Sequence, residues 1–563
     1  MRTSLRGRRT SPVARRDQES GYVAVLMSIM MLLLFSMAAF AVDVGNWYLT
    51  GQKLQKAADA GALAGVPYLP ATPAQAFTVA GDNVANNGFI ASGHVGAGET
   101  MNATLDTRLA GSPTRLRVTV GTTVSNVFGN LLGVSKTTIV RTSVADYSGP
   151  VPLGSPCNKF GNDPDPGPTT PGQQCAKVTG GFWANVGSLN TPKNYGDAFQ
   201  NNYCAPAADG SVVDNCTAIG GTNTDYAVDG YFYSVTLSKP VNNLVLEAFD
   251  PAFVAVGDRC ETSSLMGASA VQNTATNNWA LRYAPGLNAF CTGDIQHSDV
   301  GRPLTTQFTV RQAIGTSSSQ DPLSYPVVST ATCGQKTYDG YDGDLATALD
   351  GASPRYDAEV ARVFRNWVSL CTIPYAPAGQ YLIQVKTNGL GNDVAPSSHN
   401  RFSLRAHSPT DATAAHSIGI AGLSKMAMMT NAPSSLTQFH LARLSSGAAS
   451  KTFTVKLFDI GDSSQPGTIQ LKAPEGSGVE FTDCRGSRPG VSVTNCSFPV
   501  TNILFDGKWQ TIELDVPADY TCDDLDPNAC WVTLEYDYGV GSAPNDTTSW
   551  TASLQGDPVR LIE

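Results

Sequence analysis

The aspartates Asp339, Asp342 and Asp344 have the spacing of a cation-binding turn. They lie in a six-residue stretch that also contains two glycines, and Ca²⁺ loops present carboxylate oxygens from turns of this kind. The later bidentate glutamate of an EF-hand loop is missing. A solvated Asp/Gly turn is the alternative interpretation, and the sequence leaves both open.

Asp459 and Asp462 invite comparison with the D-x-S-x-S metal site of von Willebrand A domains. Gly461 stands where that motif requires its first serine, so we expect only a turn at the end of a strand. The six histidines form no H-x-x-x-H or H-E-x-x-H pattern, and no G-x-S-x-G, Walker A or S-x-x-K motif has a suitable context. We therefore predict a protein without catalytic residues, metal or cofactor.

The cysteines indicate disulfide bonds formed in an oxidising compartment. Structural zinc sites favour cysteines separated by two to four residues, whereas the closest pair here has seven residues between them. An even number confined to one part of the chain is typical of disulfides. Sequence does not define the connectivity, and pairing of neighbours gives Cys157–Cys175, Cys204–Cys216, Cys260–Cys291, Cys333–Cys371, Cys484–Cys496 and Cys522–Cys530.

An apolar stretch from Tyr22 to Val42 must position everything that follows. It contains no charged residue, and as a helix its 21 residues span roughly 31 Å, enough to cross a bilayer core of about 30 Å. Six arginines precede it, and the first residue after it is Asp43. Because basic residues stay on the cytoplasmic side, we expect the N-terminus inside and residues 43–563 outside. A cleaved signal peptide is the alternative interpretation.

The helical pattern continues beyond the span to Gly65. Leu49, Lys53, Lys56 and Ala60 recur every three or four residues, so the helix is expected to leave the bilayer without a break. Its surface from Ala57 to Gly65 consists mostly of alanine and glycine. Such a surface suits close helix–helix contact with a partner, and it suits equally a simple alanine-rich helix.

This N-terminal stretch carries three recognisable elements: a glycine before the span, V-D-x-G at its outer edge, and L-Q-x-A-A-D-A-x-A-L-A beyond it. It resembles the N-terminal segment of the TadE/TadG-like family of tight-adherence (Flp) pilus-assembly proteins. The residues that carry the resemblance, and to which it assigns anchor and assembly roles, are Gly21, Asp43, Gly45, Leu54, Gln55, Ala57, Ala58, Asp59 and Ala60. The similarity extends to about residue 147 through two strand-like runs and the apolar turn Val127–Val134.

The resemblance implies a membrane-anchored, surface-exposed protein that acts in pilus assembly or adhesion, without catalysis. Its partners would be other pilus-assembly membrane proteins, and its location the bacterial cytoplasmic membrane. Pilin-like members that are processed carry a glutamate five residues after the cleavage glycine, where this chain has Leu26. We therefore expect an uncleaved anchor.

Composition indicates a mainly β protein outside the membrane. Charged residues make up only 15%, while glycine and proline are abundant, as in β-rich domains with many turns. The chain has a net charge of −10, and residues 1–20 contain six arginines against Asp17 and Glu19, so the part after residue 20 carries about −14. Such an acidic exterior argues against a nucleic-acid partner. Two similar pairs of alternating strands, 231–238 with 243–250 and 438–445 with 452–459, indicate a weak internal repeat. A helix is expected over 358–370, within a possible insertion at 257–375.

The predicted fold is an N-terminal transmembrane helix, a small α+β juxtamembrane region and two tandem antiparallel β-sandwich modules of jelly-roll type, stapled by disulfides. The predicted regions are a basic head (1–20), the membrane and juxtamembrane helix (21–66), the α+β region (67–147), a Pro/Gly/Cys-rich linker (148–227), module one with an insertion (228–435) and module two (436–563). An alternative function is an anchored carbohydrate-binding or hydrolytic ectodomain. Its surface-glycan site would use Trp183, Tyr231, Tyr233, Trp509 and Tyr536.

Overall fold

The structure of the chain is a computed structural model. It describes residues 19–562 except for the segments 95–100, 111–113, 148, 155–157, 162–180, 257–291, 298–302, 316, 318–320, 388–396, 432–435, 463–464, 487, 489–490, 525, 527–528, 540–544 and 556–558.

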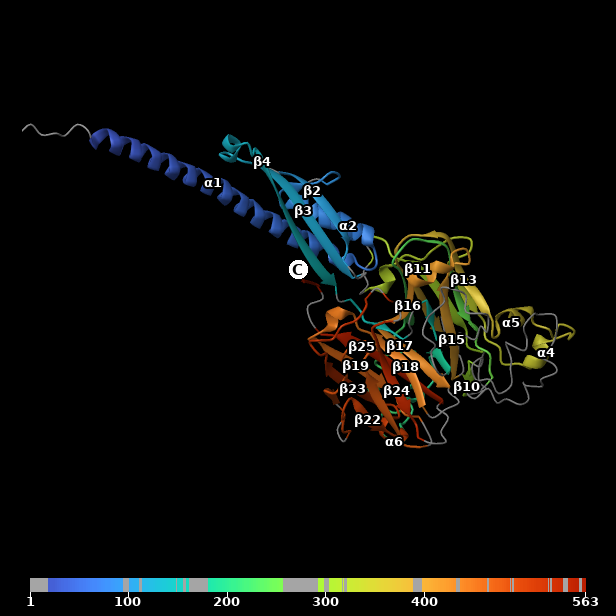
Figure 1. Ribbon diagram of the computed structural model, residues 1–563. Helices are drawn as coiled ribbons and strands as arrows, with labels where there is room; N and C mark the ends of the chain where they lie inside the picture. The colour runs from blue at the N-terminus through green and yellow to red at the C-terminus, as the bar shows by residue number, and fades with distance from the viewer. Residues whose placement is uncertain are drawn as a thin grey trace, which may run out of the picture.

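A single helix, α1 (Glu19–Gly65), projects from the rest of the protein (Figure 1). Nearly all its side chains between Tyr22 and Val42 are exposed, because no other described segment packs against them. The hydroxyls of Ser28 and Ser36 donate to carbonyls one turn earlier, at 2.7 Å each, so they leave no unpaired polar group in lipid. In the described part of the chain, this helix alone is long and apolar enough to cross a membrane. The predicted apolar helix is therefore present, and it is a candidate membrane anchor.

A juxtamembrane domain packs along the second half of α1 (Figure 1). It consists of residues 43–147 together with the last strand of the chain, β26. The two strand-like runs expected within this region are confirmed as β3 and β4. Its elements after α1 are η1 (Val66–Tyr68), α2 (Pro73–Asn86), β1 (Phe89–Ile90), β2 (Met101–Leu109), β3 (Arg115–Ser125), η2 (Gly129–Leu132), β4 (Lys136–Tyr147) and β26 (Val559–Leu561).

The five strands of this domain form one sheet in the order β1-β2-β3-β4-β26. β3 and β4 are a long hairpin whose tip carries η2, as the apolar turn Val127–Val134 predicted. β26 pairs antiparallel with β4, so this last described strand lies beside the second half of α1 (Figure 1). The juxtamembrane domain is thus closed by both ends of the chain.

The rest of the described chain forms two large antiparallel sheets packed face to face. Ring contacts between the sheets show the shared core, for example Phe308 to Phe402 (5.3 Å) and Phe439 to Trp550 (6.2 Å). The mainly β architecture and the antiparallel sheets expected from the sequence are confirmed. The first sheet comprises β6 (Lys159–Phe160), β7 (Gly181–Gly187), β9 (Val241–Phe249), β10 (Ile295–Gln296), β13 (Trp367–Ala376), β15 (Ser398–His407), β17 (Lys425–Asn431), β19 (Thr452–Phe458), β21 (Cys484–Gly486), β23 (Trp509–Asp515) and β25 (Asn545–Leu554). The second comprises β5 (Pro152–Leu153), β8 (Tyr231–Leu237), β11 (Thr306–Gln312), β12 (Gln335–Tyr338), β14 (Gly379–Thr387), β16 (Ile418–Leu423), β18 (Leu436–Arg443), β20 (Gly467–Lys472), β22 (Ser497–Val500) and β24 (Trp531–Asp537).

The strand order of both sheets is symmetric about its centre. The first sheet runs β13-β9-β15-β7-β17-β25-β19-β23-β21, in which the edge strand β21 has no counterpart at the other end. The second runs β12-β11-β14-β8-β16-β5-β18-β24-β20-β22. In the first sheet, β13, β9 and β15 therefore occupy positions equivalent to those of β23, β19 and β25. In the second sheet, β8 occupies the position equivalent to that of β18. We call β5 to β15 repeat one and β16 to β25 repeat two. The internal repeat predicted from two pairs of strands is confirmed at the level of topology.

The repeats share sheets instead of forming separate bodies. β17, which precedes residue 435, pairs with β25, which follows it. In the second sheet, β5 pairs with both β16 and β18, so both sheets run through the predicted boundary at residue 435. Because shared sheets do not show where one module ends and the next begins, the predicted domain boundaries stay predictions. Residues 181–187 of the predicted linker form β7, and the possible insertion 257–375 contains β11 and β13, whose counterparts are β20 and β23.

The helix expected over 358–370 is wrong in its second half. α5 ends at Val363, Arg365 has a left-handed φ of 47°, and β13 begins at Trp367. β13 pairs along β9, and this long-range pairing overrides the local helical pattern.

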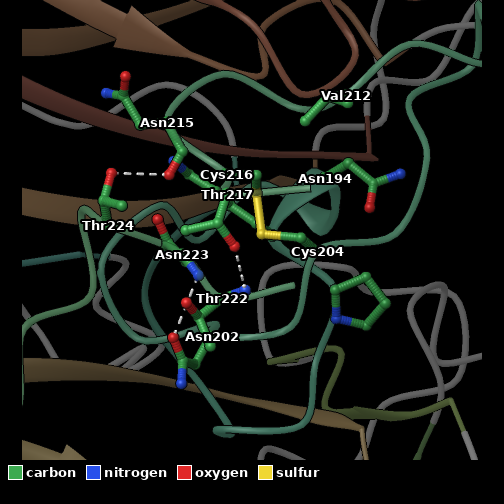
Figure 2. The surroundings of a disulfide bond; sticks show 12 residues. Asn194, Asn202, Cys204, Val212, Asn215, Cys216, Thr217, Thr222, Asn223 and Thr224 are labelled. Carbon is green, nitrogen blue, oxygen red and sulfur yellow. Dashed lines mark hydrogen bonds between the residues drawn. A yellow bond between two sulfur atoms is a disulfide. The ribbon is translucent and has the colours of Figure 1, made fainter. Parts of the chain in front are cut away.

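Four predicted disulfides are confirmed: Cys204–Cys216, Cys333–Cys371, Cys484–Cys496 and Cys522–Cys530. The predicted pairs Cys157–Cys175 and Cys260–Cys291 lie outside the described residues. Figure 2 shows the first of the four, which closes the loop 204–216. Beside it, Thr222 N donates to Thr217 Oγ1 (3.0 Å) and Thr224 Oγ1 donates to the carbonyl of Asn215 (2.8 Å). This loop leaves repeat one and contacts repeat two, because Asp214 N donates to the carbonyl of Gly507 (2.9 Å).

Candidate functional site

Asp43, at the outer end of the apolar span, holds the tip of the β3–β4 hairpin. Its side chain is 2% exposed and accepts three backbone N–H bonds. Val127 N donates to Oδ1 at 2.8 Å, while Phe128 N and Gly129 N donate to Oδ2 at 3.0 and 2.7 Å. Hydrogen bonds to a carboxylate are stronger than those between neutral groups. The aspartate of V-D-x-G therefore fastens the hairpin to α1 at the outer end of the apolar span.

A second contact fixes the same tip one turn further along α1. Trp47 Nε1 donates to Asn126 Oδ1 at 2.8 Å. The Asn126 amide in turn donates to the carbonyl of Val134 (2.9 Å) and to Thr137 Oγ1 (3.0 Å). The tip leaves Val127 63% exposed and Val134 55% exposed beside the apolar span. Such side chains suit contact with the membrane surface.

The alanine- and glycine-rich face of α1 is occupied within the chain. Leu54, Ala57 and Ala58 are fully buried against the juxtamembrane domain. A Cβ on Gly65 would stand 2.5 Å from the carbonyl oxygen of Ala76 on α2, so only glycine permits this approach. The expectation that small residues meet another protein therefore needs correction for these buried positions. They serve packing between α1, α2 and β3.

The other motif residues lie as follows. Gln55 Nε2 donates to Asp59 Oδ1 (2.8 Å) and to the carbonyl of Thr142 (3.3 Å), which ties α1 to β4. Ala60 is half-buried. Gly21 and Gly45 have no described atom within 4 Å of an added Cβ, so packing within the chain does not require glycine at either position.

The juxtamembrane domain is joined to the β-sheets by polar contacts. Arg115 on β3 donates through Nη2 to Ser446 Oγ (2.8 Å), and the same nitrogen lies 3.5 Å from Asp524 Oδ2. Gln380 N, at the start of β14, donates to the carbonyl of Ala71 (3.0 Å). Together with β26, these contacts link α1 and the juxtamembrane domain to the two large sheets. No local pattern in the sequence could predict these contacts, because the two partners of each are distant along the chain.

An open cavity of about 210 Å³ lies between the juxtamembrane domain and the second sheet. Pro70 and Thr114 line one side, and Thr236, Ile420 and Trp531 the other. Pockets for organic ligands usually exceed about 300 Å³. We therefore regard the cavity as part of the junction between the two bodies.

The proposed sugar-binding aromatics are wrong as a surface platform. Trp183, Tyr231 and Tyr233 are completely buried, Tyr536 is 1% exposed, and Trp509 is partly buried. Trp509 Nε1 also donates to Asp225 Oδ2 (3.0 Å).

The two aspartate clusters noted in the sequence have different environments. Asp339, Asp342 and Asp344 are exposed and lie just before α4 (Leu345–Leu349). Asp459 and Asp462, by contrast, approach Asp506, with one carboxylate oxygen of each within 4.8 Å of the others. The sequence did not connect Asp506 with this turn.

Residues 21–76 match the Tad family model, which describes TadE/G-like Flp pilus-assembly proteins. The match spans the apolar helix, Asp43, the packed L-Q-x-A-A-D-A run and the start of α2, and it confirms the resemblance noted in the sequence over these residues. No curated protein matches the chain. The N-terminal region is thus a TadE/G-like segment, and its apolar helix is a membrane-anchor candidate that supports a pilus-assembly-related role.

Proposed function

We propose that this protein is a single-span, extracytoplasmic, non-catalytic component of Flp (tight-adherence) pilus assembly or of adhesion to surfaces. Its N-terminus would face the cytoplasm, and the two-repeat sandwich would stand outside the membrane. The observation that carries the proposal is the overlap between the TadE/G-like match and the Asp43 contact with the hairpin.

Two further observations support this orientation. The arginines that precede the span favour a cytoplasmic N-terminus. The four disulfides all lie after the span, and disulfides persist in oxidising compartments. A fusion of alkaline phosphatase to the C-terminus should be active if this orientation is correct. An inactive fusion on a stably expressed protein would reverse the proposed topology.

The proposed mechanism is mechanical. α1 anchors the protein, and Asp43 fixes the hairpin tip at the level where the helix emerges. The sheet of the juxtamembrane domain then carries this position to the sandwich through Arg115 and β26. A sandwich held at one height and angle presents the same face to the other pilus-assembly proteins in every copy.

Complementation of a strain that lacks the gene tests the proposal. We expect the wild-type protein and Asp106→Asn, which alters an exposed aspartate on β2, to restore surface pili or adherence. Asp43→Ala, and a version in which a cleavable signal peptide replaces α1, should fail although their ectodomains accumulate. Restoration by the released ectodomain would overturn the anchoring role. Pili that assemble normally on cells that no longer adhere would assign the protein to adhesion, and no defect in either would overturn the proposal.

A further inference from the structure

The two repeats provide an internal comparison at the end of β9 and of β19. Each strand ends in Phe-Asp, and Asp250 and Asp459 are both buried with left-handed φ values of 53° and 57°. Arg365 N donates to Asp250 Oδ1 (3.0 Å), and Gly507 N donates to Asp459 Oδ1 (2.6 Å). The first aspartate is therefore a turn device that both repeats share.

The three positions around this turn differ in charge between the repeats. Asp506 precedes Gly507 as Phe364 precedes Arg365. Asp462 follows Asp459 by three residues, as Phe253 follows Asp250. Phe458 pairs with Ser549, and Asp546 lies three residues before that serine. Phe249 pairs with Ser403, and Asn400 lies three residues before that serine. In repeat one these positions are thus Phe253, Phe364 and Asn400, all fully buried. The fold forms with neutral residues there, so it does not require the three carboxylates of repeat two.

The carboxylates of repeat two converge. One oxygen from each of Asp459, Asp462 and Asp506 lies within 4.8 Å of the others. Asp546, 1% exposed, is held beside them by Gly461 N (2.9 Å) and Tyr538 Oη (2.7 Å), both donating to Oδ2. Asp459 Oδ2 and Asp546 Oδ1 are buried and accept no hydrogen bond within 3.5 Å.

Two lysines lie near these carboxylates, but in the described part of the chain their hydrogen bonds go to other groups. Lys193 Nζ donates to Asp225 Oδ2 (2.8 Å), and Lys508 Nζ donates to Ser211 Oγ and the carbonyl of Val212 (2.7 Å each). Burial, together with the charges of Asp462 and Asp506, raises the pKa of Asp459 well above its usual range. In repeat one, the buried Asp294 instead has Arg401 beside it, whose backbone N–H donates to Oδ1 at 2.8 Å.

We propose that Asp459, Asp462, Asp506 and Asp546 bind one Ca²⁺ ion. The donors are all oxygens, which hard cations prefer, and oxygens around Ca²⁺ at about 2.4 Å stand up to about 4.8 Å apart. Asp459, Asp462 and Asp506 meet this limit, and Asp546 is the carboxylate next to them that would complete the site. Mg²⁺ requires a tighter octahedron, with bonds of about 2.1 Å. Asp459 Oδ2 and Asp546 Oδ1 are the oxygens left for the ion. The site is distinct from the exposed turn at Asp339, and it does not depend on the pilus role.

The ion would also join the two repeats. Ala208 N, from the Cys204–Cys216 loop of repeat one, donates to Asp506 Oδ2. The backbone of Asp214 in the same loop bonds Gly507. Ca²⁺ binding in repeat two would therefore hold this loop against the site.

The test is thermal unfolding and calorimetry of the full-length protein in detergent. After removal of metal with EDTA, CaCl₂ at about 1 mM should raise the Tm by at least about 5 °C, with one ion bound per chain, and MgCl₂ should give a much smaller rise. Asp462→Asn/Asp546→Asn should abolish the Ca²⁺ response but raise the Tm in EDTA, because it removes repulsion. Asp342→Asn, in the exposed turn, is the matched control and should respond as wild type.

A second measurement needs no variant. Tb³⁺, an ion with similar ligand preferences, should show luminescence when tyrosine is excited, because Tyr538 donates to Asp546, and Ca²⁺ should displace it. Absence of both the Ca²⁺-dependent Tm rise and the Tb³⁺ signal would overturn the site. A full Ca²⁺ response in the double variant would overturn the ligand assignment, and an equal response to Mg²⁺ would overturn the choice of ion.

Discussion

Replacing Asp43 with alanine should release the hairpin tip from the membrane helix. The change removes three N–H bonds to one buried carboxylate. Each such bond contributes about 1.5–3 kcal/mol, but the three share one acceptor group and do not add fully. Water reaches the freed amides, since Val127 is 63% exposed. We therefore expect a loss of about 2–4 kcal/mol in the stability of the tip.

Hydrogen exchange measures this loss where it occurs. A change of about 2–4 kcal/mol opens the tip about 30- to 900-fold more often, because each 1.36 kcal/mol is a factor of ten. The peptide covering Val127 to Gly129 should exchange faster by this factor in detergent micelles, while β-sandwich peptides keep their wild-type rates. Asp43→Asn keeps one acceptor oxygen and should give an intermediate value.

Asp106→Asn is the matched control for this experiment. Asp106 is exposed on β2, and its carboxylate lies 3.7 Å from the similarly exposed Arg108, so its loss should change stability by less than about 0.5 kcal/mol. If Asp43→Ala exchanges at the tip within threefold of wild type, Asp43 does not hold the hairpin. The mechanical coupling proposed for the anchor would then lose its basis.

Three further predictions concern packing, acid stability and the disulfides. Gly65→Ala should destabilise the juxtamembrane domain by about 1–3 kcal/mol, since its Cβ would stand 2.5 Å from a backbone oxygen, whereas Gly45→Ala, with open space around it, should cost nothing in the same thermal melts. Burial lowers the pKa of His440 to about 4, so the folded state keeps the imidazole neutral while the unfolded chain binds a proton below about pH 6.5. The contribution of His440 to stability should therefore be complete above about pH 6.5 and decrease by up to about 3 kcal/mol as the pH falls to 4. His440→Phe should remove this part of the acid sensitivity. A pH profile of the variant that equals that of the wild type would contradict the assignment. Replacing Cys333 and Cys371 by serine opens a loop with a sequence separation of 38 and should cost about 4 kcal/mol in denaturant unfolding, unless native strain offsets the loss of loop closure.

Local patterns in the sequence predicted the elements that those patterns control. The uninterrupted apolar run gave α1, and alternation of apolar and polar residues gave β8, β9, β18 and β19. Neighbouring cysteines gave the four disulfides that the structure describes. β25 has the polar sequence NDTTSWTASL, and β26 has three residues, so neither carries a periodic signal that would identify it.

Interactions between distant segments account for what the sequence did not reveal. Asp43 was recognised as a motif residue, but its three partners lie more than 80 residues away, and only the hairpin brings them to the helix. Residues 364–370 have a helical pattern, yet the segment turns at Arg365 and joins β9 because pairing and burial there outweigh helix propensity. The aromatic residues considered for sugar binding could not be assigned to a face until the two sheets defined an inside.

Comparison of equivalent positions in the two repeats distinguishes residues that the fold requires from residues that need another explanation. Where both repeats keep a feature, as with Asp250 and Asp459, the fold accounts for it, because both turns need the same buried acceptor and left-handed backbone. Where a buried carboxylate such as Asp546 replaces a neutral residue such as Asn400, the fold does not account for it. A buried, unneutralised carboxylate destabilises a protein by several kcal/mol unless a cation or proton compensates it. Asp462, Asp506 and Asp546 add three carboxylates beside Asp459, and a bound cation would account for them, although in sequence order only Asp459 and Asp462 are neighbours.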